Sequence, residues 1–249
     1  MRNEAVAQRI VQALNCRAGD RVLEIGAGEG ILTGHLADSA CDTLIAVEID
    51  ARLTAALRER YQERAEIIQA DFLGLPLADK AQGGKIKIIG NIPYYLTSEI
   101  IFKILEAADH IECAVLMVQK EVAERLAAAP RTKAYGLLSV FVQARAQSTV
   151  LFAVGREQFY PPPKVDSCVV RLVFTNAVIR QIDDYALFRE IVAHSFRMRR
   201  KMLRNSLKAL LARQGVTRVR SVDLQKRPEE LSIAQFVALA NEMRTNTVN

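Results

Sequence analysis

Short apolar runs alternate with longer segments of helical spacing over the first 175 residues of the chain. Seven of the apolar runs have the length and composition of strands, and they cover residues 21–25, 43–47, 66–69, 86–90, 112–118, 147–154 and 166–174. Helical spacing separates the first five, for example at residues 32–38, 51–63 and 97–107. This alternation predicts parallel βαβ units, and therefore an α/β fold.

The end of the pattern is different. Only a proline-rich loop separates the last two predicted strands, so we expect them to pair as an antiparallel hairpin at the edge of the sheet. After Thr175 no further strand is indicated, and from Tyr185 onward the spacing is helical, interrupted at Gly215 and Pro228. The sequence therefore predicts two domains, residues 1–175 and a small helical domain of residues 176–249.

Composition limits the classes of protein to consider. The chain has 249 residues, of which 50% are hydrophobic, enough to bury one substantial core. It shows neither a basic-then-apolar leader nor an apolar run that could span a bilayer, so we expect a cytoplasmic protein without a membrane partner. The four cysteines are widely spaced in apolar settings without any C-x-x-C pair, which predicts reduced core residues and no metal site. They are Cys16, Cys41, Cys113 and Cys168.

Positive charge is concentrated at the C-terminal end. Residues 176–249 contain 14 Lys and Arg against 7 Asp and Glu, whereas residues 1–175 contain 20 against 21. A cationic segment on a near-neutral body suits a polyanionic partner, because neutralised phosphates release counterions. A solvated helical face explains the charge alone equally well.

A glycine-rich turn follows the first predicted strand. Residues 22–30 read VLEIGAGEG, a strand that runs into a turn and then a helix. Glycines at Gly26 and Gly28 permit a tight turn and the close approach of a ligand, and the helix start presents free N–H groups. A dinucleotide-dependent dehydrogenase fits this motif nearly as well, and a purely structural turn remains an alternative.

Acidic and aromatic residues end the next two strands. Glu48 lies twenty residues after Gly28, where a carboxylate can accept hydrogen bonds from both hydroxyls of a ribose. At the end of the third strand, Asp71 can accept the amino hydrogens of an adenine while Phe72 lies against the ring. Taken singly, Asp71 fits a helix cap and Phe72 a core position nearly as well. Together they predict a nucleoside-type cofactor.

The motif Asn91-Ile92-Pro93-Tyr94, directly after the fourth strand, is the most specific. The exocyclic amine of adenine is a poor nucleophile, because its lone pair is delocalised into the ring. Two acceptors, the Asn91 side-chain oxygen and the Ile92 carbonyl, would localise that pair on nitrogen, while Pro93 fixes the backbone. Tyr94 offers a face on which a flipped base can stack. No charged general base is needed before the transfer.

A further aromatic residue lies in the loop between the last two strands. Three prolines stiffen this loop, and Phe159 is placed to close over the second face of the flipped base. A stiff loop without any role in ligand binding is an equally good interpretation.

Together these motifs resemble the small-subunit ribosomal RNA adenine dimethyltransferases of the KsgA type. The resemblance covers essentially the whole chain and is carried by EIGAGEG, VEID, ADF, NIPYYLTSEI, MVQKEVAERL, FYPPPKVDS and FRMRRKMLRNSL. The arginine-rich last segment favours this branch over the resistance enzymes that modify large-subunit RNA. The resemblance implies a Rossmann-like class I methyltransferase fold, with a mostly parallel seven-stranded sheet, helices on both faces and an antiparallel last strand.

The resemblance also implies an activity. The enzyme is expected to transfer methyl groups from S-adenosylmethionine to N6 of two adjacent adenines in a hairpin loop near the 3′ end of small-subunit (16S) rRNA. The product of the donor is S-adenosylhomocysteine. Assembling 30S-type subunits are the expected substrate, and the protein is expected to act as a monomer without metal.

The resemblance carries over Gly26, Glu48, Asp71 and Asn91 as cofactor positions, and the motifs described above add Gly28 and Phe72. It carries over Asn91, Pro93 and Tyr94 as the catalytic motif, to which the proline-rich loop adds Phe159. The RNA-contacting set is Arg197, Arg199, Arg200, Lys201 and Arg204.

The chain departs from the family pattern in two places. Family members usually begin with a segment resembling G-Q-N/H-F-L that covers the cofactor, and the sequence has no counterpart before Met1. From this difference we expect either that the chain is trimmed or that its affinity for the cofactor is weakened and depends on the substrate. Ala27 replaces the commoner proline of the glycine turn, which preserves close approach.

Four rival functions remain open. A dehydrogenase would share the glycine turn and Glu48 but has no use for the Asn91–Tyr94 motif. An enzyme that methylates DNA adenine or protein glutamine could use a similar motif, but the basic helices and the lack of a DNA-reading domain argue against it. The others are a non-catalytic RNA-binding assembly factor of the same fold and a large-subunit rRNA adenine methyltransferase.

Overall fold

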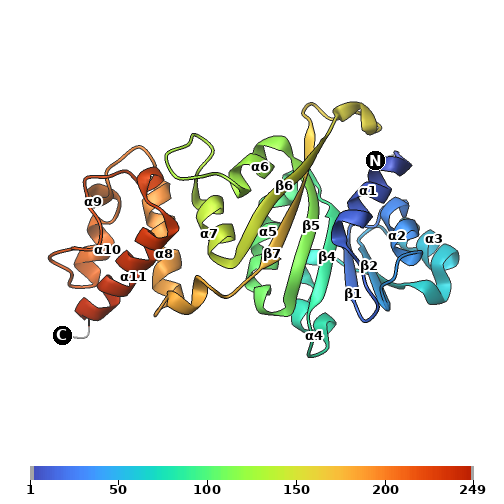
Figure 1. Ribbon diagram of the computed structural model, residues 1–249, viewed down its shortest axis with the longest axis horizontal. Coiled ribbons are helices and arrows are strands. Elements are labelled where there is room, and N and C mark those ends of the chain that lie inside the picture. The colour runs from blue at the N-terminus through green and yellow to red at the C-terminus, as the bar shows by residue number, and fades with distance from the viewer. Residues whose placement is uncertain (1–2, 248–249) are drawn as a thin grey trace. The chain divides into compact units, whose positions relative to one another are not determined.

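The computed structural model describes residues 3–247, which form two compact units (Figure 1). The first unit comprises the chain up to Ala123 together with Gln147–Phe174. The second comprises Glu124–Ala146 together with the chain from Thr175 onward. The sequence predicts a domain boundary after residue 175. In the structure the first unit ends one residue earlier, at Phe174.

A seven-stranded sheet forms the centre of the first unit, in the order β3-β2-β1-β4-β5-β7-β6. The strands β1 to β5 pair in parallel with one another, and β7 runs antiparallel to β5. Each strand begins and ends within one residue of its prediction, and the bounds are β1 (Arg21–Ile25), β2 (Thr43–Glu48), β3 (Glu66–Gln69), β4 (Ile86–Asn91), β5 (Ile111–Gln119), β6 (Ala146–Val154) and β7 (Ser167–Phe174). The predicted class I methyltransferase topology is confirmed.

Burial on both faces explains why the central strands read as continuous apolar runs. Nearly every residue of β1, β2, β4 and β5 is buried, as expected for parallel strands that helices cover on both sides. One hydrophobic core joins α1, α2 and α3 to the strands. The helices of this unit are α1 (Glu4–Leu14), α2 (Ile31–Ala37), α3 (Ala51–Tyr61), α4 (Leu77–Ala81), α5 (Thr97–Glu106) and, ending in the second unit, α6 (Lys120–Leu126).

The predicted hairpin lies at one edge of the sheet. Strands β6 and β7 are hydrogen-bonded neighbours, with β6 at the edge. Helix α1 supports this edge, because the Arg9 guanidinium lies 3.8 Å from the ring centroid of Phe152 on β6. The Asn3 side chain, which caps α1, also donates a hydrogen bond to Gln158 in the proline-rich loop. The loop is therefore attached to the N-terminal helix.

The second unit is helical, with α7 (Leu137–Arg145), α8 (Tyr185–Arg197), α9 (Leu203–Ser206), α10 (Lys208–Arg213) and α11 (Ile233–Thr247). Its core contains the rings of Tyr135, Phe196 and Phe236, with centroids about 6 Å apart from one to the next. The Tyr135 hydroxyl donates to the Leu231 carbonyl at 2.9 Å. Residues 124–146 thus complete the core of the C-terminal helices, although the sequence pattern had grouped them with the first domain.

The cysteines divide into two pairs. Cys113 and Cys168 are buried in the core, as predicted, whereas Cys16 and Cys41 are half-buried. The fold brings Cys16 and Cys41 together, and interaction with the Cys16 thiol lowers the pKa of Cys41 to about 6. None of the four forms a disulfide within residues 3–247.

Membrane-spanning helices and clusters of metal ligands are both absent from the described part of the chain. No helix within residues 3–247 combines the length and apolar character needed to cross a bilayer. The same residues contain no group of three His, Cys, Asp or Glu side chains placed to hold a metal ion.

A buried acid lies within the glycine-turn strand. Glu24 on β1 is 1% exposed and accepts a hydrogen bond of 2.7 Å from the Thr33 hydroxyl on α2. Burial raises the pKa of Glu24 to about 8, because removing the carboxylate from water penalises its charged form. The side chain is therefore mostly protonated near neutral pH.

This burial predicts a pH-dependent stability. Between the ordinary pKa of 4.5 and the folded value of about 8, only the folded chain holds the Glu24 proton. The free energy of unfolding should therefore fall as pH rises through this window, by at most roughly 1.4 kcal/mol per pH unit. Urea unfolding from pH 5 to pH 8 should show the fall, and Glu24→Gln should remove it. Exposed Glu59→Gln is the control; parallel curves for Glu24→Gln and the wild type would contradict the prediction.

Candidate functional site

The predicted cofactor residues meet at one edge of the sheet. In the register of the parallel strands, Ile25 at the end of β1 pairs with both Val47 and Gly90, and Glu48 pairs with Gln69. The carboxyl ends of β1 to β4 therefore lie side by side, and the loops that follow them share this edge. Ligands of open α/β sheets bind at such an edge.

The glycine turn has the backbone that the sequence requires. Gly26 and Gly28 have φ values of +66° and +58°, a left-handed conformation that side-chain-bearing residues rarely adopt. The Gly26 amide donates to the Val47 carbonyl at 2.9 Å, which holds the turn against β2. A Cβ at Gly26 would meet no atom within 4 Å. The space beside this backbone can thus accommodate a ligand.

Glu48 holds the turn together. Its Oε2 accepts the Gly28 amide at 2.8 Å, and its Oε1 accepts the amides of Ile49 and Asp50 at 2.8 and 2.9 Å. A carboxylate offers about four acceptor positions, so three are used within the protein. To pair with both hydroxyls of a ribose, as the sequence predicts, the Glu48 carboxylate would have to share its acceptor positions between these amides and the ligand.

Asp71 and Phe72 occupy the structural roles that were the alternatives to ligand binding, a helix cap and a core position. The Asp71 Oδ1 accepts the Leu73 amide at 2.9 Å and caps a short helical turn, while Phe72 is buried at 6% exposure. The rest of the Asp71 side chain is exposed at the edge of the sheet. The predicted contact of this pair with an adenine stays a prediction.

The Asn91–Tyr94 motif presents two acceptors. Asn91 ends β4 half-buried, and the Ile92 amide donates to the Met117 carbonyl at 3.0 Å. The Pro93 carbonyl is occupied, since it accepts from the Leu96 amide at 3.1 Å. Within residues 3–247, no hydrogen bond engages the Asn91 amide oxygen or the Ile92 carbonyl. Asn91 is half-buried and Ile92 is only 1% exposed, so the Asn91 oxygen is the more open of the two acceptors.

A tyrosine–serine hydrogen bond connects this motif to the last strand. The Tyr94 hydroxyl lies 2.7 Å from the hydroxyl of Ser167, which begins β7 and is fully buried. The sequence alone does not assign a role to Ser167. Its position directly after the proline-rich loop was the available signal.

Two other aromatic residues, Phe159 and Tyr95, differ in their exposure. Phe159, predicted to cover a flipped base, is half-buried and packs against the core cluster that includes α1. Tyr95, for which the sequence predicts no role, follows Tyr94 and is 81% exposed.

The predicted RNA-contacting cations are not equivalent. Arg197, Arg200, Lys201 and Arg204 are exposed. Arg199 instead forms an ion pair of 2.7 Å with Glu229 and donates to the carbonyls of Thr132 and Lys133 at 3.3 and 2.8 Å. Arg199 thus connects three segments of the helical unit.

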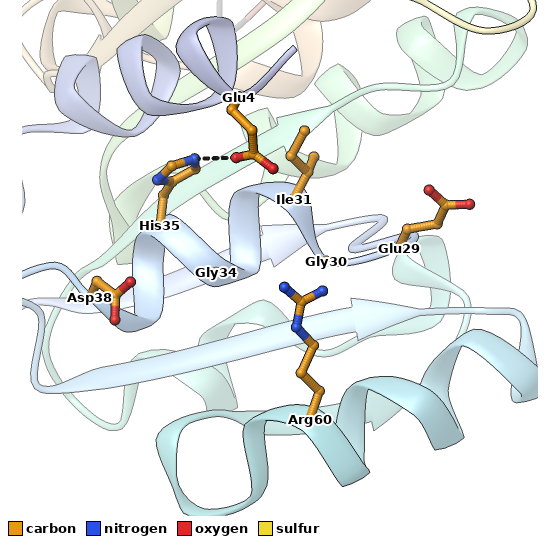
Figure 2. A pocket seen from close by; sticks show the side chains of 8 residues that line it. All are labelled: Glu4, Glu29, Gly30, Ile31, Gly34, His35, Asp38 and Arg60. Atoms are coloured by element: carbon orange, nitrogen blue, oxygen red, sulfur yellow. Dashed lines mark hydrogen bonds and ion pairs between the residues drawn. The ribbon is translucent and has the colours of Figure 1, made fainter. Parts of the chain in front are cut away.

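A cavity of about 610 Å³ lies next to the glycine turn, between α1, α2 and α3 (Figure 2). It is lined by Glu4, Glu29, Gly30, Ile31, Gly34, His35, Asp38 and Arg60. Glu4 and His35 are joined by a hydrogen bond of 2.8 Å across one end. None of the predicted cofactor residues lines this cavity, so it is distinct from the edge where they meet.

Comparisons with known proteins agree with this arrangement. A ribosomal RNA small subunit methyltransferase A from Acinetobacter baylyi is 42% identical over 247 residues, 98% of this chain and 89% of that protein. A protein of the same name from Pseudomonas aeruginosa is 39% identical over 98% of this chain and 91% of its own length.

Solved structures give the same result. A dimethyladenosine transferase from Plasmodium falciparum is 25% identical with a TM-score of 0.82, covering 99% of this chain and 98% of that one. The 23S rRNA methyltransferase ErmE is 28% identical with a TM-score of 0.67, covering 98% and 99%. A family model for ribosomal RNA adenine dimethylases matches residues 1–245. The resemblance found in the sequence is confirmed: the chain is a methyltransferase that belongs to the ribosomal RNA adenine dimethylase family.

Proposed function

We propose that the protein transfers methyl groups from S-adenosylmethionine to N6 of two adjacent adenines in a hairpin loop near the 3′ end of small-subunit rRNA. It acts in the cytoplasm as a monomer on assembling 30S-type subunits. The observation that carries the proposal is the pair of unengaged acceptors at Asn91 and Ile92, on the sheet edge that also carries the glycine turn. The names of the relatives support the small subunit as the target.

The residues at the edge fit the cofactor. The open space beside Gly26 accommodates a ligand against the backbone, and Glu48 fixes the turn in place. Asp71 and Phe72 then contact the adenine of the cofactor from the next strand end. When bound, S-adenosylmethionine supplies a methyl group on a positively charged sulfur, and S-adenosylhomocysteine is left after transfer.

The acceptors activate the substrate amine. Hydrogen bonds from N6 to the Asn91 side-chain oxygen and the Ile92 carbonyl favour the form in which the lone pair lies on nitrogen. S-adenosylmethionine held at this edge would supply the methyl group to which this lone pair bonds. The nitrogen then loses a proton to solvent, so no charged base is needed. The buried Ile92 amide, fixed by Met117, keeps the two acceptors in position.

Tyr94 positions the flipped base by stacking. Its hydroxyl is held by Ser167, so the orientation of the ring depends on the start of β7. Base stacking on an aromatic side chain is worth about 1–3 kcal/mol. Phe159 closes the second face only after it leaves its contact with the core cluster.

Labelled methyl transfer to unmodified small ribosomal subunits tests the proposal. Large subunits and duplex DNA are parallel substrates, and nucleoside analysis identifies the modified base. Dimethyladenine in small-subunit RNA alone is the expected result. Methylation of large subunits alone would replace the proposed target, and subunit binding without any methyl transfer would favour the assembly-factor alternative.

Asn91→Ala should separate catalysis from binding. Loss of one acceptor should lower kcat by at least about a hundredfold, by analogy with the loss of a single oxyanion-hole donor. The affinity for small subunits should change by less than about twofold, because the exposed cations are untouched. Single-turnover rates and a filter-binding assay measure the two quantities. Equal losses in both would mean that Asn91 is a structural residue.

The Tyr94–Ser167 hydrogen bond predicts a non-additive pair of variants. Tyr94→Phe keeps the ring but removes the hydroxyl, and Ser167→Ala removes its partner. Each should cost about 1 kcal/mol of stability, and the double variant should lose no more kcat/KM than the worse single variant. Ser167→Thr, which keeps a hydroxyl, should restore activity. Additive losses in the double-mutant cycle would exclude the coupling.

The cations should affect RNA binding unequally. Arg204→Gln removes an exposed charge and should reduce the salt dependence of RNA affinity by about one unit of log–log slope. Arg199→Gln should leave the slope nearly unchanged but lower the melting temperature, because its guanidinium holds Glu229 and two carbonyls. A slope change for Arg199→Gln as large as that for Arg204→Gln would contradict this assignment.

A further inference from the structure

One stretch of the helical unit carries only positive charge. Between Glu190 and Asp223 the sequence contains nine Lys and Arg and no Asp or Glu. The stretch covers the C-terminal half of α8 and the short helices α9 and α10. Such a segment attracts phosphate groups whatever the sequence of the nucleic acid.

A cavity of about 460 Å³ lies within this stretch, and we call it the α8–α10 cavity. Helix α8 and its C-cap contribute His194, Arg197 and Met198, α9 contributes Asn205 and Ser206, and α10 contributes Lys208, Ala209 and Ala212. Its volume lies in the range of about 300–1,000 Å³ that small-molecule sites occupy.

The lining combines planar, apolar and polar groups. His194 and Arg197 are planar, and such side chains stack on unpaired bases in RNA complexes. Met198, 49% exposed, adds an apolar surface, and Ala209 contributes only a short side chain to the lining. The Asn205 amide carries both a donor and acceptors, the groups that read the edge of a base.

The charges of the lining are free to bind an anion. Within residues 3–247, neither Arg197 nor Lys208 forms an ion pair. The nearby acid Glu190 is engaged, since it pairs with Arg213 and lies 3.7 Å from the His194 ring nitrogen. A phosphate that approaches the cavity therefore meets two cations without a competing carboxylate.

We propose that the α8–α10 cavity binds one unpaired nucleotide of the RNA substrate. The base enters between the planar groups and Met198, and its phosphate lies against Arg197 and Lys208. A base within a duplex cannot enter, because its faces are already stacked. The inference rests on the proposed function for the presence of RNA, and it adds a second contact point that recognises single-stranded RNA away from the methyl-transfer site.

Nuclear magnetic resonance of the labelled full-length protein tests the inference directly. Adenosine monophosphate at millimolar concentration should shift the amide signals of Asn205, Ser206, Ala209 and Ala212. Ribose 5-phosphate and inorganic phosphate, which lack the base, should shift them much less. Shifts of equal size with phosphate alone would overturn the nucleotide site and leave a simple anion site.

A variant that fills the cavity without changing charge separates this site from general electrostatic attraction. Ala209→Phe should abolish the nucleotide-induced shifts and weaken binding of single-stranded RNA about tenfold, the equivalent of one lost stacked base. Binding of a duplex with the same number of phosphates should not change. Ala186→Phe, the same substitution at an exposed position of α8, is the control, and equal behaviour of the two variants would overturn the inference.

Two further measurements keep the result interpretable. If Ala209→Phe unfolds the helices, Lys208→Ala, which removes a phosphate contact on the surface, should still weaken single-stranded RNA binding more than duplex binding. Methyl transfer by the wild type is measured in parallel. Absence of transfer by the wild type refutes the proposed function, whereas normal transfer with no difference between Ala209→Phe and Ala186→Phe refutes the cavity alone. A peptide that displaces adenosine monophosphate, as measured by these amide signals, would also overturn the assignment to RNA.

Discussion

The carboxylate of Glu48 organises the edge of the sheet on which the site depends. By accepting three backbone amides, it fixes the glycine turn after β1 to the loop that opens α3. The neighbouring strand β4 must also come close, and a Cβ at Gly90 would lie 2.9 Å from the Ile25 carbonyl. These two constraints place the loops after β1, β2 and β4 at one edge, so a single carboxylate and a single missing side chain govern the geometry of the site.

The sequence was sufficient for the elements whose signals are local. Continuous apolar runs marked the strands that are buried on both faces, and glycines at positive φ marked the turn. The motif from Asn91 to Tyr94 was recognisable because a strand precedes it and proline restricts its backbone. For these features, the residue type and its neighbours within a few positions determine the structure.

Other features depend on contacts between distant residues, which spacing cannot reveal. Ser167 meets Tyr94 across 73 positions, and Arg199 uses its guanidinium on carbonyls at residues 132 and 133. A sequence pattern showed Arg199 as one more cation in a basic run. It likewise showed Glu48 as an acceptor for a ligand, although the backbone takes most of its capacity. In each case the structure assigns a polar group to the protein itself.

The assignment of residues 124–146 to the helical unit has a consequence for how the chain is built. The polypeptide leaves the first unit, returns to it for β6 and β7, and leaves it again. No single cut of the polypeptide separates the two units, and a chain ending at residue 175 would leave Tyr135 without its partners Phe196 and Leu231. During synthesis, the sheet is therefore complete before the helical core can close, and the segment between β5 and β6 must wait for the last helices to emerge.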